Sequence, residues 1–142
     1  GEQPDINFEA VEALVGEGRV REIFELTRAV SRRDLESALS CLRRLLERGE
    51  YPLGILGMLA RQVRLLLRAK ELIVQSRPPA EISKLLGIPR PFVSEILDGA
   101  RTSSLPRLEH GLVRLLDLDK VLKTWGTGQF LYLELAIIDL CR

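Results

Sequence analysis

The chain has 142 residues, of which 46% are hydrophobic and 29% are charged, and its net charge of +1 excludes the overall basicity of a typical nucleic-acid binder. This length suits one hydrophobic core, and the composition is that of a globular protein. No apolar run approaches the roughly 20 residues that span a bilayer, and residues 1–10 lack the regions of a signal peptide, so we expect a cytoplasmic protein with no membrane contact.

Helical periodicity dominates the chain, and no stretch alternates apolar and polar residues as a half-buried strand would. We therefore predict an all-α fold, a single-domain bundle of about seven or eight helices. Residues 1–7 are expected to be a disordered or added N-terminal segment, and residues 8–142 the helical domain. The first two helices are predicted at about Phe8–Val15 and Val20–Val30.

The next two helices carry clear start and stop signals. Ser31 is the predicted N-cap of a helix over Arg32–Arg48, which Gly49 closes. A long helix from about Pro52 to Gln75 begins with proline in its first turn, where a missing N–H costs least. Its leucines wrap around more than one face, so we expect this helix to be central.

The second half of the chain contains a short helix pair and two further helices. The pair runs from Ala80 to about Thr102, and an amphipathic helix follows from Ser104 to Thr124. The final helix, "QFLYLELAIIDLCR", has few charges, which is typical of a core or interface helix.

The short pair has the outline of a helix-turn-helix. Gly87 suits the left-handed turn residue, and Ser83 is small where the two helices must cross. The residues expected to pack the pair together are Ile82, Leu86, Ile88, Val93 and Ile96. The second helix would offer DNA the side chains Arg90, Ser94, Glu95 and Asp98. Two of these are acidic and would face phosphates, so the pattern favours a pair that only packs over one that reads DNA.

Charged residues on two of the helices are candidates for contacts. Arg61, Arg64 and Arg68 form one basic stripe on the long helix, which is either a solvated edge or a contact to an acidic partner. Asp119 falls on the predicted inward stripe of its helix, and Lys123 four residues later is its natural partner. We therefore predict a structural ion pair that is at least partly buried.

The sequence contains few residues of the types that form catalytic or metal sites. Cys41 and Cys141 are expected to be free thiols, and His110 is the only histidine, so we expect no metal and no cofactor. No phosphate loop, HExxH or GxSxG motif occurs in the sequence. We expect no enzyme activity, although the absence of a motif leaves an unrecognised catalytic site as a remote alternative.

Several segments in this order resemble a known family. They are "REIFELTRAV", "RDLESALSCLRRLLERGEYPLGILGMLARQVRLLLRAKEL", "AEISKLLGIPRPFVSEILDGAR", "LDKVLKT" and "LYLELAIIDLC". Together they are similar to the C-terminal helical domain of the bacterial DNA polymerase III delta subunit, a component of the sliding-clamp loader. Arg61 and Gln62 fit the family's "LARQ" run, and Asp119, Lys123 and Thr124 fit its "D..LKT" pattern.

The resemblance implies a collar domain that carries no catalytic site and joins other clamp-loader subunits during DNA replication. It also implies that contact with the sliding clamp is made by a preceding domain absent from this chain, and that contact with DNA is indirect. The residues expected at a subunit interface are Arg61, Gln62, Arg64, Arg68, Phe130, Leu131, Ile137 and Ile138. The alternative is a small helix-turn-helix DNA-binding protein.

Overall fold

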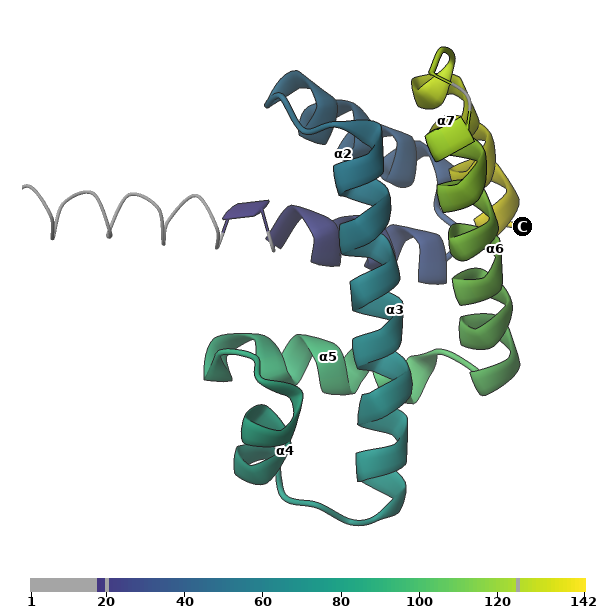
Figure 1. The fold of residues 1–142 in the computed structure, drawn as a ribbon. Coiled ribbons are helices and arrows are strands. Elements are labelled where there is room, and N and C mark those ends of the chain that lie inside the picture. Colours follow the sequence, from purple (N-terminus) through teal and green to yellow (C-terminus); the bar gives the residue numbers. More distant parts are fainter. Residues whose placement is uncertain (1–17, 20, 125) are drawn as a thin grey trace, which may run out of the picture.

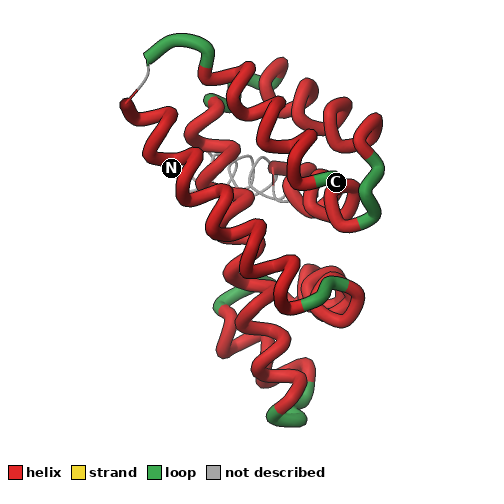
Figure 2. Tube along the Cα trace, turned by 90° about the vertical axis from the view of Figure 1, so that its right-hand side faces the viewer, coloured by secondary structure: helices red, strands yellow, loops and turns green. Residues whose placement is uncertain are grey.

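The computed structural model describes residues 18–142 apart from 20 and 125, and every regular element in this part of the chain is an α-helix (Figures 1 and 2). Residues 18–19 and 21–31 are helical, and we call the latter the 21–31 helix. The labelled helices are α2 (Leu35–Glu47), α3 (Pro52–Val74), α4 (Pro79–Leu86), α5 (Arg90–Thr102), α6 (Leu105–Thr124) and α7 (Gln129–Leu140). The predicted all-α single domain is confirmed. The expected segment 1–7 and the expected helix Phe8–Val15 lie outside the described residues.

The start of α2 differs from the prediction. Ser31 still belongs to the 21–31 helix, and the chain turns through Arg33, whose φ of 60° is left-handed. Asp34 is the N-cap instead, because its Oδ1 accepts a hydrogen bond from the backbone N–H of Ser37 at 3.2 Å. At the other end Gly49, with φ of 92°, closes the helix as expected.

The central position predicted for the long helix is confirmed. α3 runs through the middle of Figure 1 and contacts α4, α5, α6 and α7. Ile55 and Leu59 in its first half belong to the main core, which also contains residues of α2, α6 and α7. In its second half, Leu66 packs against α5, and Leu72 packs against both α4 and α5, which together form the short helix pair. One helix thus joins two parts of the molecule.

The short helix pair has the predicted helix-turn-helix geometry. Gly87 ends α4 with φ of 66°, a conformation that glycine adopts without strain. The hydroxyl of Ser83 donates to the carbonyl oxygen of Ile88 at 2.9 Å, which holds the turn against α4. Ile82 and Ile96 are fully buried between the helices and α3. The pair is therefore part of the packed domain.

The 21–31 helix connects the two parts of the core. Leu26 is buried in the main cluster, whereas Phe24 stacks on Phe92 of α5 with ring centroids 5.4 Å apart. Aromatic pairs in this distance range add stability beyond the area that they bury. This helix consequently fixes the position of α5 relative to the rest of the bundle.

Candidate subunit interface

The outward face of α7 is the most apolar exposed helix surface in the described part of the chain. Leu133 and Ile137 point into the main core and are fully buried. Leu131 and Leu135, which lie four residues apart on the opposite face, are 58% and 51% exposed. The large exposed apolar residues of this helix, which we call the α7 ridge, are Phe130, Leu131, Tyr132 and Leu135. Exposed apolar ridges of this kind mark contact surfaces.

Two interface residues predicted from the sequence are buried within the domain itself. Gln62 is only 5% exposed, because it lies on the side of α3 that faces the core and a cleft beside α5. Ile137 has no exposed surface. Neither side chain can meet another subunit, so this part of the prediction is wrong. Of the remaining apolar candidates, Phe130 and Leu131 are exposed and Ile138 is partly exposed.

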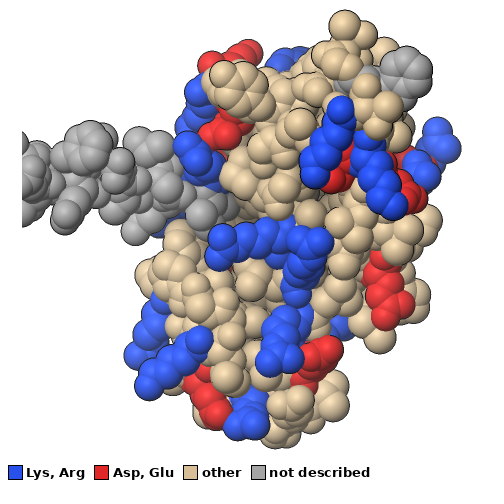
Figure 3. Space-filling view, in the orientation of Figure 1, with Lys and Arg blue, Asp and Glu red and all other residues tan. Residues whose placement is uncertain are grey.

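The arginine stripe of α3 is exposed as expected. Figure 3 shows Lys and Arg side chains along the face on which α3 runs, and Arg61, Arg64 and Arg68 are all exposed. Arg68 Nη1 lies 3.0 Å from Glu71 Oε2. The helical period places the stripe opposite the α3 face that packs with Leu133 of α7. The stripe and the α7 ridge are therefore separate surfaces.

The structure brings Asp119 and Lys123 together at the edge of α6. Lys123 Nζ lies 2.8 Å from Asp119 Oδ2, but the two side chains are 65% and 34% exposed. The inward position expected for the aspartate is occupied by Leu118, which is buried in the main core. Because water reaches both charges, this pair resembles a surface salt bridge in its energetics.

The DNA-reading face proposed for α5 is partly occupied by another helix. Ser94, Glu95 and Asp98 line a cleft of about 410 Å³ whose other wall includes Arg28 of the 21–31 helix. The guanidinium of Arg28 pairs with the carboxylate of Glu95. This hydrogen bond raises the pKa of Arg28, against the smaller lowering effect of its burial. Sequence reasoning missed the contact, because no local signal relates residues 67 positions apart.

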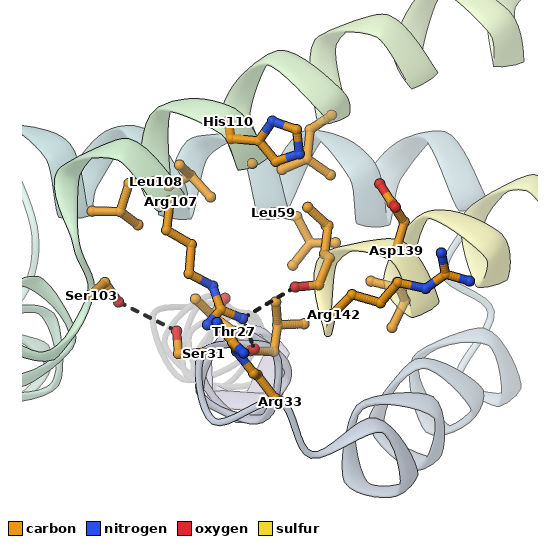
Figure 4. A pocket seen from close by; sticks show the side chains of 16 residues that line it. Thr27, Ser31, Arg33, Leu59, Ser103, Arg107, Leu108, His110, Asp139 and Arg142 are labelled. Atoms are coloured by element: carbon orange, nitrogen blue, oxygen red, sulfur yellow. Dashed lines mark hydrogen bonds between the residues drawn. The ribbon is translucent and has the colours of Figure 1, made fainter.

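Arg107 is a second residue that sequence reasoning missed. Its Nη2 donates to the carbonyl oxygens of Val30 at 2.8 Å and Leu140 at 3.2 Å, as the close view of Figure 4 shows. These carbonyls lie at the ends of the 21–31 helix and α7, where the helix dipole favours a cation. The Val30 carbonyl also accepts a hydrogen bond from the backbone N–H of Arg33 at 3.0 Å. Because its partners are backbone carbonyls, no particular side chain in the sequence points to this contact.

The described residues contain little that could perform chemistry. Cys41 and Cys141 are free and buried, and burial raises the pKa of both thiols, which disfavours the reactive thiolate. In residues 18–142 apart from 20 and 125, no group of three or more His, Cys, Asp or Glu side chains could hold a metal ion. No helix in this part of the chain has the length and apolar character needed to cross a membrane.

Comparison with known proteins assigns the chain to a family. A family model described as the C-terminal domain of the DNA polymerase III delta subunit matches residues 20–140. The chain belongs to this family. The match runs through α4 and α5, so the helix pair is part of the family's domain, and the alternative of a separate small DNA-binding protein is not supported.

Two relatives from Bacillus subtilis agree with this assignment. The DNA polymerase III subunit delta of strain 168 is 29% identical over 143 residues, which cover all of this chain and 41% of that protein. A solved structure of a DNA clamp loader delta protein is 28% identical, with a TM-score of 0.79 over 86% of this chain and 36% of that one. The chain thus spans about two fifths of the length of these relatives.

Proposed function

We propose that the chain is the collar domain of a clamp-loader delta subunit and that it joins the other loader subunits through the α7 ridge. The family assignment supports the first part, because similar chains are named as the delta subunit and the clamp loader delta protein. The exposure of Leu131 and Leu135 is the observation that carries the second part. An interface centre is usually apolar, and this surface is the best match among the described residues.

In this proposal the domain binds and positions but catalyses nothing. Its partners are the corresponding domains of other loader subunits in the cytoplasm, while contact with the sliding clamp belongs to preceding domains and contact with DNA is indirect. A stable interface covers roughly 800 Å² on each partner, more than four side chains supply, so residues beside the ridge such as Ile138 would contribute. The arginine stripe is then available for a separate contact with an acidic surface.

The proposal is tested with the full-length natural protein and its candidate loader partners. Co-purification of the full-length protein with the other loader subunits should require residues 18–142. The isolated 142-residue chain should hydrolyse no nucleotide. If the full-length protein associates with no loader subunit, the proposed function fails. Titration of the isolated chain with labelled DNA duplexes examines the rival function, because selection of one duplex sequence at physiological salt would favour a DNA-binding domain.

A further inference from the structure

A cavity with a distinctive lining lies between the 21–31 helix, α3, α6 and α7 (Figure 4). Its volume is about 300 Å³, and Arg107 reaches across it from α6, so we call it the Arg107 pocket. A cavity of about 150 Å³ in another protein is large enough to bind benzene. The Arg107 pocket can therefore hold a ligand larger than a single aromatic ring.

The floor of the pocket is apolar. Leu59 and Val63 of α3 lie beside Leu108 and Leu115 of α6 and Ile137 of α7. These residues belong to the packed core or lie against it, so the floor is held by the fold. Pockets for small molecules combine such an apolar lining with a few fixed polar groups.

The charged groups at the rim are mainly cationic. Arg33, Arg107 and Arg142 all line the pocket, whereas the carboxylate of Asp139 is engaged by Arg114 Nη2 at 2.8 Å. The rim therefore favours an anionic group. His110 also lines the pocket, and its side chain is labelled at the upper edge of Figure 4.

Arg107 is held in place beside the pocket and keeps hydrogen-bond donors of its own. The carbonyl oxygens of Val30 and Leu140 hold its Nη2, which leaves the N–H groups on Nη1 and Nε without a hydrogen-bond partner among the described residues. Both forks of a guanidinium include Nη2, so an anion here accepts single charge-assisted hydrogen bonds from Nη1 or Nε. The hydroxyls of Ser31 and Ser103 share a hydrogen bond of 3.5 Å at the rim, which leaves one of the two O–H groups as a further donor.

We propose that the Arg107 pocket binds a carboxylate carried on an apolar group. The apolar part covers Leu59 and Leu115, and the carboxylate lies at Arg107 and Arg33. The ligand is either a free small acid or the acidic and apolar side chains of a protein segment, since both offer the same chemistry. This inference is independent of the proposed collar function, because it depends on the pocket alone.

The test is a titration of the 142-residue chain, followed by the amide and methyl NMR signals of the pocket. The probes are 4-phenylbutanoate and its uncharged analogue 4-phenylbutanamide. We expect saturable shifts at Gly111, Leu140 and Val63 with the acid, and binding at least about fivefold weaker with the amide, as for the loss of a partly exposed charge pair. No saturable shift up to about 10 mM acid, or equal binding of the amide, would overturn the proposal.

Two charge-reversal variants distinguish the effect of a rim cation on binding from the effect of the overall charge of the protein. Arg33→Glu removes a cation of the rim and should weaken binding of the acid at least about fivefold. Arg32→Glu is the matched control, because Arg32 is the adjacent exposed arginine but does not line this pocket. It should change the affinity by less than about twofold. Equal effects of the two variants would contradict a specific site.

A third variant and a second ligand complete the experiment. Ser31→Leu narrows the cavity without removing charge, so a folded Ser31→Leu chain that bound the acid normally would also overturn the proposal. The capped dipeptide Ac-Phe-Glu-NH2 represents a protein segment. Tighter binding of the dipeptide than of 4-phenylbutanoate identifies a protein segment as the ligand, and tighter binding of 4-phenylbutanoate identifies a free acid.

Discussion

Arg28 and Glu95 form an ion pair that joins the 21–31 helix to α5 across 67 positions of sequence. The contact lies beside the stacked rings of Phe24 and Phe92, so a polar and an aromatic pair connect the same two helices. Glu95 would otherwise be a free acidic group on the face that a helix-turn-helix presents to DNA. The same pair therefore helps to hold α5 in the bundle and occupies a side chain of the face that would read DNA.

The strength of this contact can be measured by a double-mutant cycle with Arg28→Ala and Glu95→Ala. Both side chains are partly exposed, so we expect a coupling free energy of about 0.2–1 kcal/mol in chemical unfolding. Glu109→Ala is a control, since Glu109 is an exposed carboxylate on α6 and should show no coupling with Arg28. A coupling equal to that of the control would show that the pair does not form in solution.

Replacement of Arg107 should cost more than replacement of any exposed arginine. Arg107→Ala removes two hydrogen bonds from a charged group to helix-terminal carbonyls, and we expect a loss of about 2–3 kcal/mol in the free energy of unfolding. Arg33→Ala is the matched control on the same pocket, with an expected change within about 0.5 kcal/mol. Similar values for the two variants would contradict the capping role of Arg107.

Adjacent residues of α6 should respond very differently to truncation. Asp119→Ala removes a salt bridge that water reaches, so the expected loss is about 0–1 kcal/mol. Leu118→Ala leaves a cavity in the main core and should cost about 2–5 kcal/mol. Denaturant unfolding of both variants decides which residue faces the core. A larger loss at Asp119 than at Leu118 would reverse the orientation of α6.

The N-cap of α2 makes stability depend on pH. Hydrogen bonds from Ser37 lower the pKa of Asp34 below its ordinary value of 3.8, so the carboxylate stabilises the folded state above that value. This contribution is lost as the pH falls through the lowered pKa. Asp34→Ala should therefore destabilise the chain at neutral pH, and its difference from the parent should shrink in acid.

Asp34→Asn is the control for this dependence, because the amide oxygen can cap the helix without titrating. Unfolding midpoints of the parent and both variants at neutral and acidic pH make the comparison. If the difference between Asp34→Ala and the parent stays constant across that range, ionisation of Asp34 does not contribute to the cap.

The helices themselves could be predicted because their signals are local. Pro52 at the start of α3, Gly49 after α2 and Gly87 between α4 and α5 each require a particular backbone conformation, and the structure places each where that conformation occurs. The N-cap of α2 was misplaced because Ser31 and Asp34 are both good caps. Only the length of the preceding helix decides between them.

The surface was harder to predict than the helices. Gln62 and Ile137 looked like interface residues, yet both are buried. Where a helix carries apolar residues on more than one face, its neighbours in space decide which face is buried. Asp119 was assigned to a position that Leu118 occupies, because the closely spaced leucines of α6 fit more than one inward stripe. Arg107 binds backbone carbonyls, which every residue offers, so no pattern of side chains could reveal its partners.

The most direct test of the proposed collar function is the effect of the α7 ridge on assembly. The full-length protein carrying Leu131→Glu together with Leu135→Glu should fail to co-purify with the other loader subunits, while its helical circular dichroism and unfolding midpoint stay near those of the parent. Val74→Glu is the matched control, because Val74 is 84% exposed at the far end of α3, and this variant should assemble normally. Normal assembly of the folded double variant would contradict the proposed interface, and equal loss of assembly in the Val74→Glu control would show that the effect is not specific to α7.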